Sequence, residues 1–307
     1  MYELKKKEYN HETLDRTWSE NSYEKYKDAY KTWLWRQLPN FDLDLNTNYG
    51  LPPKKIEGSI LEIGSAAGGA YDFLTRSNLM SKEIEYTGLD ISEKGINYCK
   101  ENFKNANWIK QDLTIKKIDK KYDYIFERIA VHHMKDPLKI FENMRDMTNK
   151  SLSTSFVSCM NGDTISNLNL ARYRHDKGEY VYFNIINIFE VLEILLSKFN
   201  FIQVWYGGPH EKLFNDSTAH QYVSPEINPH NRRIGRTTLT ATIIENFDEK
   251  KIYILNKNSS VKSLVKKILF HFNEKYRDDL SFLENKIPKF LDRSKDQVTY
   301  NSPYAHK

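Results

Sequence analysis

The stretch Ser59–Phe73, SILEIGSAAGGAYDF, decides the fold. Its first five residues are an apolar run that predicts a buried strand, and a turn of small residues follows it, before a segment with helical spacing. Glycine and alanine let a ligand approach the backbone closely, and the first N–H groups of the helix point at the same place. With Ala66 in place of a middle glycine, the turn also fits a dinucleotide fingerprint. Alone, it is compatible with a phosphate, a nucleotide-type cofactor or no ligand.

Short apolar runs alternate with segments of helical periodicity from Gly58 to Asn246. This alternation predicts an α/β fold, a mostly parallel sheet with helices on both faces. The predicted strands are Ser59–Ile63, Glu85–Leu89, Asn107–Lys110, Tyr122–Phe126, Leu152–Cys159, Phe201–Trp205 and Thr238–Ile244, and the helices between the first five are Tyr71–Leu79, Glu93–Phe103 and Leu138–Thr148.

We expect three parts: an N-terminal helical cap over 1–56, the α/β domain over 57–247 and a basic helical extension over 248–307. The cap contains a helix with an aromatic face, and the extension contains an apolar stripe over 261–272 with lysines facing away from it. We expect this stripe to dock on its own domain or on a second subunit, with peripheral membrane attachment as the alternative. The oligomeric state does not follow from the sequence.

Composition indicates a cytoplasmic location. The chain has 307 residues, neither an apolar signal segment at its start nor a membrane-spanning run, and two distant cysteines that we expect to be reduced thiols. Its net charge of +5 arises in residues 250–307, which carry an excess of seven positive charges, so the rest of the chain is close to neutral. We therefore do not expect a nucleic-acid partner.

Two carboxylates mark the ends of the next two predicted strands. Asp90, in YTGLDIS, ends the second strand, and Asp112, in IKQDL, follows the third. At such positions one carboxylate can accept both hydroxyl hydrogens of a ribose, and the other can accept from the amino group of an adenine. Each aspartate alone is also typical of a helix cap or a turn. Together with the glycine-rich turn they indicate an adenosine site.

The segments LEIGSAAGG, GLDIS, IKQDL and YDYIFERIAVHHM resemble, in order and spacing, the motifs of class I S-adenosylmethionine-dependent methyltransferases. The resemblance implies a Rossmann-like, seven-stranded sheet that closes with an antiparallel pair, and S-adenosyl-L-methionine as cofactor. It implies that the turn Gly64–Gly68 lies under the methionine part, with Glu62 near the amino group, Asp90 on the ribose and Asp112 on the adenine. The further cofactor residues that it implies are Ser65, Ile91 and Leu113 beside these, with Glu127 and Arg128 after the fourth strand.

His132 and His133 follow the fourth strand, where the acceptor should lie. An oxygen nucleophile must lose its proton, and an imidazole can accept it near neutral pH. We expect one of the two histidines to be a general base or an acceptor contact; the alternative is that both pack at the strand–helix junction.

Two long segments, Asn161–Tyr180 and Gly207–Arg236, should determine acceptor selectivity. The candidate substrate residues within them are Arg172, Arg174, His175 and His210. Their cationic character suits an acidic acceptor such as a phosphorylated or carboxylated sugar; solvated loop charge is the alternative reading. The histidines lack metal-ligand spacing, so no metal is expected.

The sequence therefore predicts a methyltransferase that acts on an oxygen, or less readily a nitrogen, of a small molecule or glycan, such as a bacterial surface sugar. The competing interpretations are a nucleic-acid methyltransferase, a nicotinamide-dependent oxidoreductase and a non-catalytic scaffold that binds S-adenosylmethionine.

Overall fold

The structure is a computed structural model that describes residues 57–76, 80–127, 129–174, 180–209, 221–227, 234–243 and 251–254. The predicted cap over 1–56 and the apolar stripe over 261–272 lie outside the described residues.

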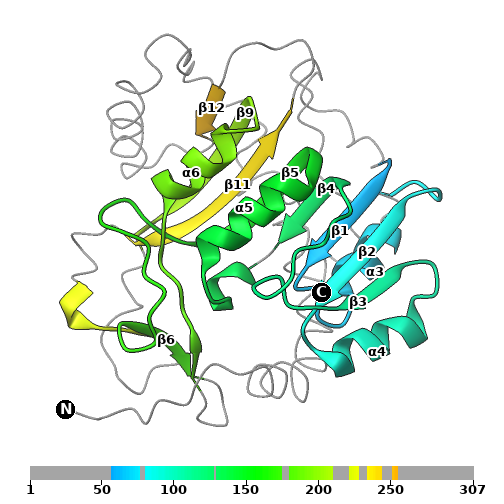
Figure 1. The fold of residues 1–307 in the computed structure, drawn as a ribbon, viewed down its shortest axis with the longest axis horizontal. Coiled ribbons are helices and arrows are strands. Elements are labelled where there is room, and N and C mark those ends of the chain that lie inside the picture. The colour runs from blue at the N-terminus through cyan, green and yellow to red at the C-terminus, as the bar shows by residue number, and fades with distance from the viewer. Residues whose placement is uncertain are drawn as a thin grey trace, which may run out of the picture.

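The core is a mostly parallel sheet, which confirms the predicted fold class (Figure 1). Five parallel strands come first in the chain: β1 (Ser59–Ile63), β2 (Glu85–Asp90), β3 (Asn107–Lys110), β4 (Tyr122–Glu127) and β5 (Thr148–Cys159). They lie in the order β5-β4-β1-β2-β3, so β1 is central, with β2 and β3 on one side of it and β4 and β5 on the other. The ends of these strands are aligned, because Ile63 lies opposite both Leu89 and Glu127.

The sheet closes with an antiparallel pair, β9 (Phe201–Pro209) and β11 (Gly235–Thr242), as the resemblance implies. Two short strands add to the seven expected. β8 (Ile186–Asn187) pairs with β5, and β12 (Lys251–Ile254) pairs in parallel with β9 at the sheet edge. Because β12 follows residue 247, where we expected the α/β domain to end, the sheet extends into the segment assigned to the C-terminal extension.

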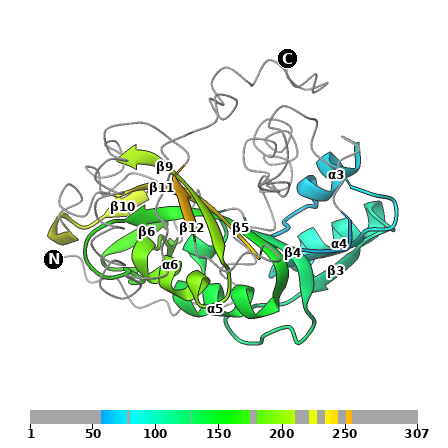
Figure 2. The same cartoon turned by 90° about the horizontal axis from the view of Figure 1, so that it is seen from above.

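Helices cover both faces of the sheet (Figure 2). On one face α3 (Gly69–Arg76) and α4 (Glu93–Asn102) pack on Tyr86 and Trp108. On the other, α5 (Pro137–Met147) packs beside α6 (Ile188–Leu196). α6 was not predicted, because its sequence IFEVLEILL is apolar except for Glu190 and Glu193, and a short apolar run also fits a buried strand.

A second, three-stranded antiparallel sheet was not predicted at all. It consists of β6 (Ala171–Arg174), flanked by β7 (Tyr180–Tyr182) and β10 (Gln221–Val223). A 3₁₀ turn, η2 (Pro225–Ile227), follows β10. The two segments interpreted as separate selectivity loops thus pair with each other, and β10 adds to β6 from about fifty residues away in the chain.

Both cysteines, Cys99 and Cys159, are buried free thiols, as expected. Among the described helices none combines the length and apolar character that a membrane crossing requires.

Candidate functional site

The glycine-rich turn after β1 has the backbone shape that its sequence indicates. Gly64 and Gly68 have φ angles of 75° and 74°, in the left-handed region that favours glycine. Gly64 is also tightly enclosed, since a Cβ there would lie 2.5 Å from Cβ of Ala130. This contact brings the turn next to the segment that follows β4. Ala66 also has a left-handed φ, of 46°, a conformation that glycine adopts at lower cost than alanine.

Asp90, the last residue of β2, fastens the turn to the second strand. Its carboxylate accepts hydrogen bonds from the N–H of Ala66 at 2.7 Å and from the N–H of Ser92 at 2.8 Å. A carboxylate can accept more than two hydrogen bonds, so the same group can also receive hydroxyl donors of a ribose. Asp90 therefore combines a structural bond to the turn with the position expected for the ribose contact.

Glu62 and Ser65 bracket the start of the turn, and both are buried. The Glu62 carboxylate is 1 % exposed and accepts a hydrogen bond from the Tyr86 hydroxyl at 2.5 Å. The Ser65 hydroxyl is buried and has no hydrogen-bond partner within the described part of the chain. Because a buried hydroxyl is costly without a partner, this orphan group fits a polar ligand at the turn.

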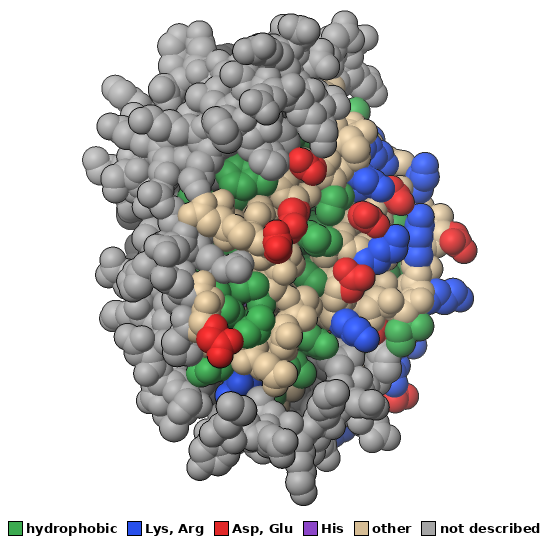
Figure 3. Space-filling view, turned by 60° about the vertical axis from the view of Figure 1, so that its left-hand side comes forward, with side chains coloured by type: hydrophobic (Ala, Val, Ile, Leu, Met, Phe, Trp, Pro, Cys, Tyr) green, Lys and Arg blue, Asp and Glu red, His purple; other side chains and the backbone are tan. Residues whose placement is uncertain are grey.

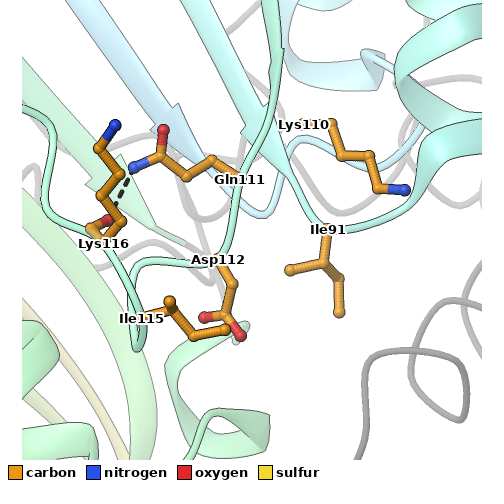
Figure 4. A pocket seen from close by; sticks show the side chains of 6 residues that line it. All are labelled: Ile91, Lys110, Gln111, Asp112, Ile115 and Lys116. Atoms are coloured by element: carbon orange, nitrogen blue, oxygen red, sulfur yellow. Dashed lines mark hydrogen bonds between the residues drawn. The ribbon is translucent and has the colours of Figure 1, made fainter.

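Asp112 lies in a pocket of about 270 Å³ at the end of β3 (Figure 4). Its Oδ1 accepts from the N–H and the hydroxyl of Thr114, at 2.7 and 2.6 Å. The side chains of Ile91 and Ile115 lie in the same pocket, and Ile115 is 72 % exposed, the only large hydrophobic residue in the described ranges with that exposure. Apolar groups beside a carboxylate suit an adenine, which presents flat faces and an amino-group edge.

The other pocket-lining residues are Lys110, Gln111 and Lys116, and the Gln111 amide donates to the carbonyl of Lys116 at 2.7 Å. Leu113, expected among the cofactor residues, has its side chain in the hydrophobic core, 2 % exposed. Only its backbone can therefore contribute to the pocket.

Glu127, at the end of β4, differs from the pocket-lining role that the resemblance implies. It is 1 % exposed, and its carboxylate accepts from the N–H groups of Ala130 and Val131 and, at 2.6 Å, from the Thr154 hydroxyl. Burial raises the pKa of Glu127, opposed by the hydrogen bonds that favour its charged form. Glu127 thus positions the chain after β4. Arg128, its predicted companion, lies outside the described residues.

Strained backbone follows directly after β4. Ile129 has a φ of 61°, and a β-branched residue rarely adopts this left-handed conformation. Its N–H donates to the carbonyl of Ser155 at 3.0 Å, which holds it against β5. The short 3₁₀ turn η1 (Val131–His133) starts two residues later. Such strain persists only where the surroundings enforce it, and it concentrates at functional sites.

The two histidines of η1 have different environments. His132 is 4 % exposed, and its ring packs against His133 and Phe183 at centroid distances of 4.0 and 5.8 Å. His133 is half-buried, and its Nδ1 lies 2.7 Å from the carbonyl oxygen of Tyr182. A carbonyl only accepts, so Nδ1 carries the proton, and the neutral ring has its lone pair on Nε2. The Tyr182 carbonyl therefore fixes the orientation of the His133 ring.

Asn184, which was not predicted from the sequence, also holds this turn. The residue is fully buried, and its amide donates to the carbonyls of Val131 and Met134 at 3.2 and 2.6 Å. Its backbone N–H donates to the carbonyl of His132 at 2.7 Å. No pattern in the surrounding FNIIN marks this asparagine, because its partners are backbone groups about fifty residues away.

The four candidate substrate residues are only partly placed. Arg172 lies on β6 of the small sheet, with its guanidinium over the rings of Tyr180 and Tyr222. Arg174 is on the same strand, and nothing is described of its side chain, while His175 and His210 lie outside the described residues. No cluster of three metal-ligating side chains occurs in the ranges that the structure describes.

Together these residues fit S-adenosylmethionine. The turn after β1 and the two aspartates lie at the ends of three neighbouring parallel strands, which is where open α/β sheets bind ligands. The apolar pocket at Asp112 suits the adenine, and η1 follows the fourth strand at the same edge. The arrangement can hold a cofactor across the sheet edge.

Residues 61–151 match the model of a family described as methyltransferase domain. The match runs from β1 into β5 and contains both aspartates and both histidines. The sequence has no significant match among curated proteins.

Solved structures similar to this chain share little sequence with it. The Haemonchus contortus phosphoethanolamine N-methyltransferase 2 has 15 % identity and a TM-score of 0.48, over 78 % of this chain and 61 % of that one. The DhpI–SAH complex has 16 % identity and a TM-score of 0.43, over 77 % and 98 %. An O-methyltransferase of a Brevibacillus brevis trans-AT PKS multienzyme has 12 % identity and a TM-score of 0.43, over 62 % and 67 %. Likenesses this weak do not assign an acceptor.

Proposed function

We propose that this chain, which belongs to the class I S-adenosylmethionine-dependent methyltransferase family, transfers the methyl group to an oxygen of a small molecule or glycan. The observation that carries the choice of oxygen is the hydrogen bond from Nδ1 of His133 to the Tyr182 carbonyl. Because Nδ1 donates to this carbonyl, the lone pair of the neutral ring is on Nε2, the nitrogen that can accept a proton. An amine acceptor that is already neutral has less need of such a base, whereas a hydroxyl must lose its proton as it attacks.

The chain's own residues supply binding and alignment. Asp90 accepts the ribose hydroxyls while it holds the turn, and Asp112 accepts from the adenine amino group between Ile91 and Ile115. The cofactor supplies a methyl group already activated on a sulfonium, so the protein must mainly orient the acceptor and remove its proton. Glu127 and Asn184 hold η1 in place for this step.

Mixed surface charge supports a small acceptor over a nucleic acid. On the face shown in Figure 3, Lys and Arg side chains lie among Asp and Glu side chains and do not form a basic strip. Binding to a phosphate backbone draws most of its affinity from clustered basic side chains. The sequence, with its near-neutral α/β domain, points the same way.

A methyl-transfer assay with labelled S-adenosylmethionine tests the proposal. We expect transfer to hydroxyl acceptors in a panel of sugars and small phenols, and a 10²–10⁴-fold loss of kcat in His133→Gln. Binding of S-adenosylhomocysteine, measured by calorimetry, should be unchanged in this variant, since Asp90 and Asp112 remain.

As a control, Lys139→Gln removes an exposed lysine of α5 and should leave kcat as in the wild type. Transfer to amines alone, or a kcat unaffected by His133→Gln, would contradict the assignment of oxygen and of the base.

A further inference from the structure

The two faces of the small sheet differ in character. Antiparallel partners share a face and neighbours along a strand alternate, so Ala171, Tyr173, Val181 and Val223 lie on one side. Three of these are nearly fully buried, and the ring of Tyr173 packs against that of His133 with a centroid distance of 5.6 Å. The face that carries these four residues is therefore the inner one, toward the proposed reaction site.

The other face carries an arginine framed by tyrosines. Arg172 pairs with Tyr182 on β7 and with Tyr222 on β10, and Tyr180 lies two residues before Tyr182. The Arg172 guanidinium carbon lies 4.1 Å from the ring centroid of Tyr222 and 4.9 Å from that of Tyr180. All four side chains are partly exposed. Stacking on the rings holds the planar guanidinium in one orientation.

This guanidinium has almost no polar partners. Its five N–H groups make one long hydrogen bond, 3.5 Å from Nη1 to the carbonyl of Leu168, and it has no ion pair with any described residue. Its Nε is buried and has no hydrogen-bond partner in the described ranges. A positive charge that is held rigidly by aromatic rings, with no carboxylate partner among the described residues, is arranged to bind an external one.

We propose that Arg172, with Tyr180 and Tyr222, forms a binding site for an oxyanion group, a carboxylate or a phosphate, on a sugar unit of the acceptor. The tyrosine rings pack against the sugar, and the guanidinium edge pairs with the anion. That this ligand is part of the acceptor rests on the proposed function.

The geometry also sets a minimum length for the acceptor. Arg172 and Tyr173 are neighbours on β6, so their side chains lie on opposite faces of the small sheet, and only Tyr173 contacts His133. One monosaccharide cannot occupy both faces. The anionic unit bound at Arg172 is therefore a different unit from the one that receives the methyl group, and the acceptor is an oligosaccharide or a longer glycan.

Calorimetry on the full chain tests this site directly. The probes are trigalacturonic acid, glucose 6-phosphate and the neutral trisaccharide maltotriose. We expect at least one anionic probe to bind at least tenfold more tightly than maltotriose, and the binding one identifies carboxylate or phosphate as the recognised group. Arg172→Gln should abolish this preference, and Arg172→Lys should reduce it, because a lysine keeps the charge and loses the planar stacking. The matched control, Lys139→Gln, removes one exposed positive charge on α5 and should bind as the wild type.

Affinity for S-adenosylhomocysteine reports whether each variant is folded and should be unchanged. Failure of both anionic probes to outbind maltotriose, or an unchanged preference in a folded Arg172→Gln variant, would overturn the inference. The two proposals fail separately. A chain that binds trigalacturonic acid through Arg172 and methylates no hydroxyl refutes the proposed function alone, and oxygen methylation without any effect of Arg172 refutes this inference alone.

Discussion

Replacing Ala66 by glycine should stabilise the protein. Ala66 has a φ of 46°, and the left-handed conformation costs a residue with a Cβ about 1–2 kcal/mol. Glycine removes that cost, and its greater freedom in the unfolded chain takes back about 0.4–1 kcal/mol. The difference predicts a gain of about 0.5–1 kcal/mol in the free energy of unfolding. Urea denaturation followed by circular dichroism measures it as a higher midpoint with an unchanged slope.

The neighbouring Ala67 is a matched control. It is 7 % exposed and is not among the residues with positive φ. Ala67→Gly loses the same chain entropy and a buried methyl group worth about 0.8 kcal/mol, so it should destabilise by about 1–2 kcal/mol. Affinity for S-adenosylhomocysteine should survive Ala66→Gly, because the N–H that binds Asp90 remains. If both variants lose stability alike, the left-handed backbone at Ala66 is not strained and the reasoning is wrong.

Three further predictions follow from buried or exposed groups of the site. Burial raises the pKa of Glu127, so the stability that its protonated form contributes is fully present below the usual pKa of about 4.5 and is lost as pH rises through the raised pKa. In that pH window the free energy of unfolding of the wild type, relative to that of Glu127→Gln, should fall by up to about 1.4 kcal/mol per pH unit. Urea titrations across pH measure this, and parallel curves for the two proteins would contradict it. Asn184→Ala leaves two carbonyls of the η1 segment without their donor and should cost about 1–3 kcal/mol, which thermal and urea unfolding measure; a loss below 0.5 kcal/mol would show that the two bonds do not matter. Ile115→Ala should weaken S-adenosylhomocysteine binding about fivefold in calorimetry with unchanged stability, because the side chain is exposed until a ligand covers it; undiminished affinity would place the adenine elsewhere.

The sequence predicted the parallel half of the fold because local signals are strong there. Each of the first five strands is an apolar run, and the glycine-rich turn and Asp90 mark strand ends directly. Asp112 was predicted in the same way, since strand ends of a parallel sheet share one edge. The positions could therefore be assigned to one site without knowledge of any long-range contact.

What the sequence could not predict depends on long-range pairing. The strands of the small sheet are three or four residues long, and β10 pairs with β6 across a long stretch of chain, so neither has a period to recognise. Glu127 shows a related limit of the sequence. In the sequence, a carboxylate at a strand end looks the same whether it contacts a ligand or accepts from backbone N–H groups, as the Glu127 carboxylate does.

The small sheet has a consequence for how acceptor preference can change between related chains. Its strands come from two insertions in the α/β domain, one after β5 and one between β9 and β11. Neither insertion is a complete unit, since the first alone would leave one backbone edge of β6 unpaired and the second alone would leave β10 without a partner strand. We expect that recombination between homologues preserves folding only when both insertions are inherited from the same parent, which makes specificity in this chain a trait of two linked segments.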